Sequence, residues 1–416
     1  YPPDVAVPTT EASALYPPTT EASVLYPPKN RGKRHFLLFT DVHINLDFPL
    51  GCTAGDQAPN QHPPKEVNKN PFATDGCDAP ISLLQLAADT ARSISPKPEM
   101  ALVAGDLVWH GTGKEGPGGY FDPVRNKYTF VNTTYEITKH LQLPSCVALG
   151  NNDDWPDHAV MPSDDDHDYY LEQAEAMRWA CQLRHQDGAP RRGRADFSML
   201  SWRGYYSVDL GNKLHLLVLN TAPYDASALA TKEEIERLGA NEDPLEQFAW
   251  FDACLKRIAS IGGKALVMGH IPPVIGHGGH IPERVTSLWR DEYAVIFWEI
   301  AHKHAHTIGA LLFGHKHLAD YRVWGDGAAP HAPPLLAFGA LSPVSHTSPV
   351  FYTLEVDEEN MLSRVTPYHL SADKKGDRDE EKDGPPIFEP SPSLPEAFGE
   401  DTLVNDRFGR LADALE

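Results

Sequence analysis

The 416-residue sequence predicts an α/β fold in which helices cover buried sheets. Six short apolar runs have the length and composition of buried strands, and amphipathic helical stretches separate several of them. The expected strands are residues 36–40, 100–104, 145–149, 214–219, 265–268 and 310–313. The expected helices are residues 81–94, 245–261 and 291–305. Continuously apolar strands that alternate with helices are typical of sheets buried on both faces.

The two ends of the chain have a different composition from this central part. Residues 8–17 read PTTEASALYP, and residues 18–27 repeat them with a single change. Pro and Thr at this density favour an extended polyproline-like backbone and cannot supply a packed core. We therefore expect a Pro/Thr-rich linker at 1–33, one folded domain at 34–370, and a charged and Pro-rich tail at 371–416. Both terminal segments are candidates for binding a protein partner or another copy of the chain.

Charge and hydropathy exclude several classes of function. Lys and Arg number 36 against 58 Asp and Glu, which gives a formal net charge of -22. A field of this sign repels nucleic-acid polymers and argues against polyanion binding. No run approaches 18 apolar residues, so we expect no transmembrane segment. A small phosphorylated substrate held by metal ions remains compatible with this charge.

The five cysteines predict no zinc knuckle, because none of them forms a CxxC pair. Cys52 and Cys77 bracket a loop rich in Pro, Gly and Asn, which a disulfide can close. The other three cysteines are left open between pairing and burial as free thiols, and the odd count leaves at least one unpaired. Asn132 begins the sequon Asn132-Thr133-Thr134, a candidate glycosylation site. Together these features favour a secreted, extracellular or lumenal location, the last including vacuole and lysosome.

Five of the expected strands are followed directly by side chains that can bind metal, at the ends where α/β sheets place their ligands. A glycine adjoins the ligand after four of these strands, which allows a tight turn and a close backbone approach. Residues i and i+2 of an extended chain project to the same side, so the two paired motifs can each aim two side chains at one centre. The candidate ligands are Asp41, His43, Asp106, Asn151, His270, His315 and His317.

This mixture of imidazole, carboxylate and amide oxygen suits borderline divalent ions better than calcium. We expect two divalent metal ions, with zinc favoured and manganese or iron as alternatives. Asp106 is the natural candidate for a carboxylate that bridges both ions. Single motifs of this kind are common by chance, but five of them at successive strand ends are not.

The motif series resembles that of the calcineurin-like metallophosphoesterase superfamily, which reads DxH, GD, GNH, GH and GHxH. The first, second, fourth and fifth motifs are intact here. Over about residues 35–370 the chain is more closely similar to the acid sphingomyelinase-like phosphodiesterase and endopolyphosphatase branch. Supporting matches include Cys77-Asp78-Ala79-Pro80, the stretch from Asp106 to His110, and Trp155-Pro156.

The resemblance implies a four-layer α/β/β/α sandwich with two mixed sheets. It places a first metal on Asp41, His43, Asp106 and His317, and a second on Asp106, Asn151, His270 and His315. It further implies in-line attack on phosphorus by a hydroxide that bridges the metals. His110 matches a histidine of this branch that contacts the phosphate or assists the leaving group.

The sequence departs from the family at the histidine of GNH, which is Asn152 here. Asn cannot titrate, and loss of a general acid lowers the rate by about 10²–10⁴-fold when the leaving group must be protonated. Asn152 therefore favours a phosphohydrolase for nucleotides or polyphosphate, whose leaving groups need less help, although His110 can alternatively serve as the acid. The other hypotheses are an acid sphingomyelinase-type phospholipid head-group hydrolase and a catalytically weak, metal-bound structural or interaction protein.

Three further residues are candidates for substrate contact. His277 and His280 lie in a glycine-rich loop soon after the strand that leads to His270, and Trp155 adjoins the Asn151 motif. The alternative for the histidines is a solvated loop. For Trp155 the alternative is packing in the core.

Overall fold

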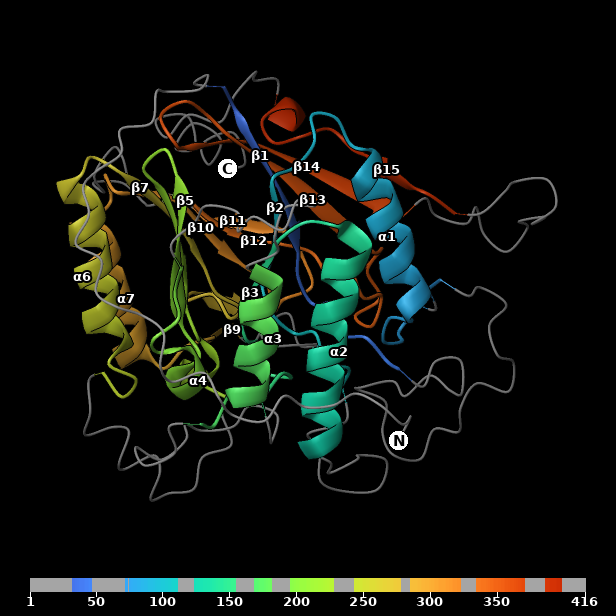
Figure 1. The fold of residues 1–416 in the computed structure, drawn as a ribbon, viewed down its shortest axis with the longest axis horizontal. Coiled ribbons are helices and arrows are strands. Elements are labelled where there is room, and N and C mark those ends of the chain that lie inside the picture. Colours follow the sequence, from blue (N-terminus) through green and yellow to red (C-terminus); the bar gives the residue numbers. More distant parts are fainter. Residues whose placement is uncertain are drawn as a thin grey trace, which may run out of the picture. The chain divides into compact units, whose positions relative to one another are not determined.

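Two sheets and their helices form four layers within the unit that spans residues 33–416 of the computed structural model (Figure 1). The helices α1, α2 and α3 cover one sheet, and α6 and α7 cover the other (Figure 1). The described residues are 32–46, 72–73, 75–110, 123–154, 168–181, 195–227, 243–277, 285–322, 334–370 and 386–398. Both sheets mix parallel and antiparallel strands, which confirms the predicted α/β fold with two mixed sheets.

The first sheet has the strand order β15-β14-β13-β1-β2-β3. Its parallel half consists of β1 (Arg34–Phe39), β2 (Met100–Val103) and β3 (Ser145–Val147). Its antiparallel half consists of β13 (Val350–Val356), β14 (Leu362–Leu370) and β15 (Phe388–Pro390). β1 joins the halves, so its carboxyl end lies centrally in the sheet.

The second sheet has the order β11-β12-β10-β7-β6-β5-β4. The parallel strands are β6 (Leu214–Val218), β7 (Lys264–Met268), β10 (Ile308–Phe313) and β12 (Leu335–Ala337). The antiparallel edges are β4 (Ala195–Asp196), β5 (Tyr206–Gly211) and β11 (Asp320–Arg322). A separate small ribbon pairs β8 (Ile275–His277) with β9 (Val285–Ser287).

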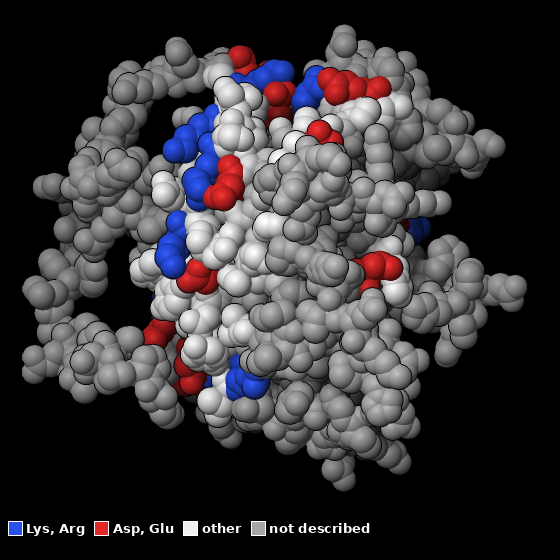
Figure 2. Space-filling model, turned by 90° about the vertical axis from the view of Figure 1, so that its right-hand side faces the viewer, with Lys and Arg blue, Asp and Glu red and all other residues white. Residues whose placement is uncertain are grey.

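The helices bury one apolar face each against the sheets. They are α1 (Ile81–Ser93), α2 (Pro123–Leu141), α3 (Leu171–Cys181), α4 (Leu200–Arg203), α6 (Gln247–Ser260) and α7 (Asp291–Lys303), with 3-10 turns η1 (Ala222–Tyr224) and η2 (Glu396–Phe398). On the side of α1 and α2, basic and acidic side chains of the described surface lie next to one another (Figure 2). On α2, Lys139 Nζ lies 3.2 Å from Glu136 Oε1. None of the described helices is long and apolar enough to cross a membrane.

The six expected strands and three expected helices are confirmed to within a few residues. The first sheet, however, extends past Leu370, where we expected the domain to end. β15 pairs with β14, and the backbones of Leu394 and Val365 hydrogen bond to each other. A Pro-rich segment can occupy this position because an edge strand does not need every backbone N–H for pairing. Residues 386–398 therefore belong to the folded domain rather than to the tail.

A disulfide between Cys146 and Cys181 links β3 to α3, which settles one of the pairings that the sequence left open. Cys77 is also disulfide-bonded, and its predicted partner Cys52 lies outside the described residues. Cys254, on α6, is a buried free thiol. A chain that carries disulfides fits an oxidising compartment.

Candidate metal centre

The structure gathers all seven candidate ligands in one place, although they come from five strands of two sheets. Asp41 and His43 follow β1, and Asp106 and Asn151 follow β2 and β3. His270 follows β7, and His315 and His317 follow β10. All except His315, which is partly buried, are buried. Such a concentration of polar groups out of water requires partners, and these residues supply them to one another.

One group of ligand atoms surrounds His317. Its Nε2 lies 3.2 Å from Asp41 Oδ1 and 3.2 Å from His43 Nε2. His43 Nε2 in turn lies 3.6 Å from Asp106 Oδ2. Two imidazole nitrogens at this separation cannot both be protonated, and their lone pairs converge on a point that a cation can occupy.

A second group surrounds Asn151. Its Oδ1 lies 3.1 Å from His270 Nε2 and 2.9 Å from His315 Nδ1. His270 Nε2 also lies 3.1 Å from Asp106 Oδ2. The same carboxylate oxygen of Asp106 thus faces both groups of candidate ligand atoms.

Backbone carbonyls orient two of the histidines. His43 Nδ1 donates to the carbonyl of Val108 at 2.8 Å, and His270 Nδ1 donates to that of Ala104 at 2.7 Å. A carbonyl oxygen only accepts, so each ring keeps a proton on Nδ1 and presents Nε2 to the centre. These contacts fix the orientation of both rings.

Several ligands have unusual backbone conformations. Asp41, His43, Asp106, His315 and His317 all adopt positive φ, between 41° and 74°. This left-handed region is uncommon for residues other than Gly, and it concentrates at functional sites. Neighbouring glycines permit the crowding, because a Cβ at Gly150 would lie 2.1 Å from Asp106 Oδ1 and one at Gly314 would lie 1.8 Å from Thr40 Oγ1.

Burial and neighbouring charges perturb the ionisation of the centre. Burial lowers the pKa of His43 well below its usual value, and the nearby His110 adds to this effect. Burial also acts to lower the pKa of His270, but the carboxylate of Asp106 outweighs it and raises that pKa to about 10. Nε2 of His270 and Oδ2 of Asp106 lie 3.1 Å apart, so a cation bound by both atoms would compete with a proton for the same place.

Residues 34–319 match the calcineurin-like phosphoesterase family. The chain belongs to this family. Among its relatives are sphingomyelinase phosphodiesterase D of Dictyostelium discoideum, which is 24% identical over 70% of this chain and 60% of its own length. The human cyclic GMP-AMP phosphodiesterase SMPDL3A is 25% identical over 73% of this chain and 62% of its own length.

The chain spans about three fifths of the length of these curated relatives. Among solved structures, a dimetal phosphatase from Danio rerio aligns over 81% of this chain and 95% of its own, with 12% identity and a TM-score of 0.45. The family, together with the clustered His and Asp side chains, gives the domain a candidate site for two divalent metal ions.

In this phosphoesterase domain, Asn152 turns toward the shared carboxylate. Its backbone N and its Nδ2 donate to Asp106 Oδ1 and Oδ2, both at 2.8 Å. The side chain is buried. Asn152 therefore holds Asp106 in place with an amide that cannot titrate.

Sequence reasoning missed Asp153, which fixes the two turns that carry Asp106 and Asn151. Its Oδ2 accepts from the backbone N of Asp106 at 2.8 Å and of Gly150 at 2.9 Å. Its Oδ1 accepts from the backbone N of Leu107 at 2.7 Å and of Val108 at 3.0 Å. Burial, followed by the charge of Asp106, raises the pKa of Asp153 to about 7. An acidic residue directly after the Asn-Asn pair was the available signal.

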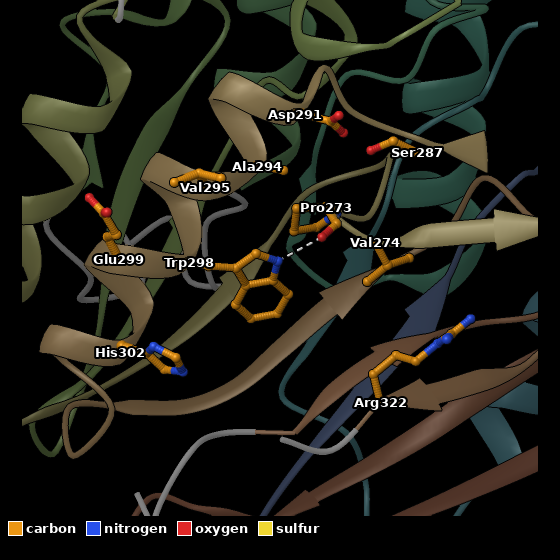
Figure 3. A pocket seen from close by; sticks show the side chains of 10 residues that line it. All are labelled: Pro273, Val274, Ser287, Asp291, Ala294, Val295, Trp298, Glu299, His302 and Arg322. Carbon is orange, nitrogen blue, oxygen red and sulfur yellow. Dashed lines mark hydrogen bonds between the residues drawn. The ribbon is translucent and has the colours of Figure 1, made fainter. Parts of the chain in front are cut away.

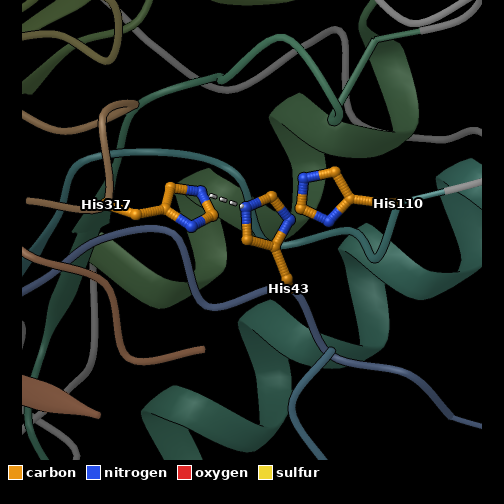
Figure 4. Close-up of side chains that lie close together, drawn as sticks. All are labelled: His43, His110 and His317. Atoms are coloured by element: carbon orange, nitrogen blue, oxygen red, sulfur yellow. Dashed lines mark hydrogen bonds between the residues drawn. The ribbon is translucent and has the colours of Figure 1, made fainter. Parts of the chain in front are cut away.

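His110 stands beside the first group with its orientation fixed by a buried carboxylate. Its Nδ1 donates to Asp78 Oδ1 at 2.8 Å, and its backbone N donates to Asp78 Oδ2 at 3.1 Å. Its ring stacks on His43 with centroids 4.0 Å apart, and His43 separates it from His317 (Figure 4). The His110 side chain is 16% exposed, so it can meet a substrate. The sequence singled out Asp78 only as part of the matching stretch Cys77-Asp78-Ala79-Pro80.

The structure does not test the roles of the remaining predicted residues. His277 ends β8, but its side chain is not among those described, and His280 and Trp155 lie outside the described residues. Asn132 lies within α2, where its amide donates to the Tyr128 carbonyl at 2.7 Å. Their predicted roles stay predictions.

A pocket of about 610 Å³ lies between α7 and the chain that follows β7 (Figure 3). Trp298 stands at its centre and donates from Nε1 to the Pro273 carbonyl at 2.8 Å (Figure 3). Val274 and Arg322 line the same hollow. None of the candidate metal ligands lines it, so it is separate from the centre.

Proposed function

We propose that this chain hydrolyses phosphodiester or phosphoanhydride bonds of a small substrate at a centre of two divalent metal ions, with zinc favoured. The observation that carries the proposal is the place of Asp106, whose Oδ2 faces His43 at 3.6 Å and His270 at 3.1 Å. A carboxylate shared by two ligand groups is what a two-metal phosphohydrolase requires.

The donor atoms fit such ions. Asp41, His43, Asp106 and His317 would hold the first metal, and Asp106, Asn151, His270 and His315 the second. His43 and His270 present Nε2 because their Nδ1 atoms are engaged by carbonyls. Imidazole and carboxylate together suit zinc, manganese or iron. Bound there, two such ions would supply Lewis-acid stabilisation of phosphoryl charge and an activated nucleophile.

The chain's own contribution to proton transfer comes from His110. Asp78 fixes its Nδ1–H at 2.8 Å, so Nε2 is the atom that faces a substrate and can donate to a departing oxygen. Asp78 is buried, and its hydrogen bonds to both the ring and the backbone of His110 hold the imidazole in one orientation.

Asn152 supports nucleotides or polyphosphate as substrates. The family motif has a histidine where this chain has Asn152. The Asn152 amide donates a hydrogen bond to Asp106, but it cannot transfer a proton to a leaving group. Expulsion of an alkoxide needs an acid more than expulsion of a phosphate or pyrophosphate does. A relative named as a cyclic GMP-AMP phosphodiesterase also supports a nucleotide-like substrate.

A sphingomyelin-type substrate is the second candidate, and one surface feature favours it. The first turns of α2 expose apolar side chains, with Val124 75% and Tyr128 59% exposed. On the same turns, Asn126 Nδ2 donates to the Asn152 carbonyl at 2.8 Å. Exposed apolar side chains on a helix that contacts the Asn152 segment offer lipid a surface on which to rest, and several relatives are named as sphingomyelin phosphodiesterases.

The test compares ATP, CTP, polyphosphate and sphingomyelin, with and without a chelator, for the natural chain and for Asn152→His. We expect chelator-sensitive hydrolysis of the anhydrides by the natural chain. Asn152→His should raise the rate on sphingomyelin more than on ATP. Efficient sphingomyelin cleavage by the natural chain would contradict the anhydride preference and assign the acid role to His110 alone.

No turnover of any substrate by a protein that contains two metals would instead support a structural or interaction role. That role is the third hypothesis, and the terminal segments 1–33 and 371–416 are then the candidates for binding a protein partner or another copy. A secreted or lumenal location is part of the proposal and is supported by the Cys146–Cys181 disulfide.

A further inference from the structure

We infer that Ser345 is a positioning residue for His317 and sets the affinity of the first metal position. The inference rests on the proposed two-metal centre. Ser345 Oγ lies 2.8 Å from His317 Nδ1, on the side of the ring away from the other ligands. His317 Nε2 faces Asp41 and His43, each at 3.2 Å.

This contact differs in kind from those of His43 and His270. The carbonyls of Val108 and Ala104 can only accept, so they keep a proton on Nδ1 of His43 and of His270 and leave Nε2 as the atom for a cation. A hydroxyl can donate or accept, so Ser345 matches either tautomer of His317. With Nε2 protonated, that N–H can donate to Asp41 while the hydroxyl donates to Nδ1.

Metal binding at Nε2 would require the other arrangement. The neutral ring would then carry its single proton on Nδ1 instead of Nε2, an exchange through solvent that leaves its proton count unchanged, and the Ser345 hydroxyl would accept a hydrogen bond from Nδ1–H. The hydroxyl thus stabilises the tautomer of His317 that can bind a metal at Nε2, but it also fits the other tautomer. The first position therefore depends on Ser345 in a way that the second position, whose His270 is held by a carbonyl, does not.

The loop that carries Ser345 is held in place by the centre itself. Leu341 N donates to the Thr40 carbonyl and Ser342 N to the Asp41 carbonyl, both at 3.1 Å. On the other side, Gly76 N donates to the Pro343 carbonyl at 3.1 Å. The hydroxyl is therefore fixed relative to the end of β1, and the contact does not depend on an unattached loop.

A second tie links this loop to the segment that orients His110. His346 Nδ1 lies 3.1 Å from Asp75 Oδ2, three residues before Asp78. The orienting residues of His317 and His110 thus lie on two chain segments that bind each other. This arrangement supports a positioning role for Ser345 rather than an incidental surface contact.

The experiment measures zinc binding to Ser345→Ala, Ser345→Thr and the natural chain by competition with a chromogenic chelator, with metal content checked by elemental analysis. Ser348→Ala, an exposed serine on the same loop, is the matched control. In Ser345→Ala we expect one of two zinc equivalents to bind about 10–100-fold more weakly and the other to be unchanged. Ser345→Thr should restore the natural affinity, and Ser348→Ala should retain it.

If the natural chain binds two zinc ions and Ser345→Ala binds both with the same affinities, this inference is overturned and the proposed centre is retained. Equal weakening of both equivalents, with a lower unfolding temperature of the metal-free protein, would also overturn it, because that pattern indicates general damage to the fold. A natural chain that binds no zinc would overturn the proposed centre and this inference together.

Discussion

The two sheets bring different chemistry to the candidate centre. The first sheet supplies both carboxylates, Asp41 and Asp106, together with His43 and Asn151. The second sheet supplies imidazoles alone, His270, His315 and His317. Neither set can complete either proposed metal position, since each position draws on both sheets. The centre therefore depends on the packing of one sheet against the other, and its metal content reports on that packing.

The helical layers of the two sheets are also stabilised differently. On the first sheet, the disulfide between Cys146 and Cys181 fastens α3 to β3. On the second, α6 and α7 pack through aromatic rings, with Phe251 and Phe297 stacked 5.7 Å apart. One layer relies on a covalent link near the ligands, and the other on burial of large side chains.

Asp106→Asn should have the largest effect, because this one residue of the first sheet serves both positions. Asn keeps the shape but loses the charge, so we expect both metal equivalents to weaken and kcat/KM to fall by more than about 100-fold. Metal content and kcat/KM measure this. His270→Asn, from the second sheet, should weaken one equivalent only, and Asp89→Asn on α1 should change neither. Loss of a single equivalent in Asp106→Asn would refute a shared carboxylate.

His110→Asn should lower the rate by about 10²–10⁴-fold for substrates whose leaving oxygen needs a proton. A p-nitrophenyl ester, whose leaving group needs no acid, should lose much less, and the metal content should stay unchanged. Asp78→Asn should show the same leaving-group pattern with a smaller loss. Equal losses for both kinds of substrate would exclude His110 as the proton donor.

Removal of the disulfide tests the first helical layer. The Cys146–Cys181 bond closes a loop with a sequence separation of 35. The double variant Cys146→Ala, Cys181→Ala should lower the free energy of unfolding by about 4 kcal/mol, as loop-closure entropy predicts for this length. Denaturant titration of the metal-free protein measures it. Cys254→Ala, in the second layer, is the comparison and should cost much less.

The smallest effect is expected at the surface of the second layer. Asp252 Oδ1 accepts from Lys303 Nζ at 2.6 Å and from His304 Nε2 at 2.7 Å, and these hydrogen bonds lower the pKa of Asp252. A pKa lowered by folding adds stability above the unfolded value of about 3.9, and that stability is lost as the pH falls through the folded value. Asp252→Asn should cost about 0–1 kcal/mol at pH 7 in unfolding experiments. The difference should disappear well below pH 4, and its persistence there would contradict the ionic cause.

The sequence predicted the parallel strands other than β12, and the seven polar residues that follow five of them, because one physical cause links them. Parallel strands are buried on both faces, so they read as apolar runs, and their carboxyl ends collect the ligands. The antiparallel strands β13 and β14 and the helices α2 and α3 carry no such terminal motif and were not predicted. The domain boundary at Leu370 failed because β15 is a Pro-containing edge strand.

Contacts between residues that are distant in the chain could not be predicted from the sequence. The orientation of Asn152 toward Asp106 depends on a rotamer, and the link from Ser345 to His317 joins residues that are 28 positions apart. Cys146 and Cys181 pair because their Cα atoms lie 4.8 Å apart, which no spacing rule shows. The sequence shows that Asp78 and Asp153 are acidic, but it does not show that Asp78 contacts His110 or that Asp153 holds the turns with Asp106 and Asn151.

The positive φ angles at the centre have a consequence for how this domain tolerates change. Asp41, His43, Asp106, His315 and His317 hold a conformation that costs a residue with a side chain about 1–2 kcal/mol in steric strain, a strain that Gly does not have. Backbone strain alone would therefore favour glycine at these positions. In a metal-free His317→Gly protein, relief of this strain should offset only part of the loss of the buried ring and of its contacts with Asp41 and Ser345. The melting temperature should then fall by less than for His317→Ala, which loses the same ring and keeps the strained backbone. The strain at the centre is thus a cost to the fold that persists where the chemistry requires these side chains.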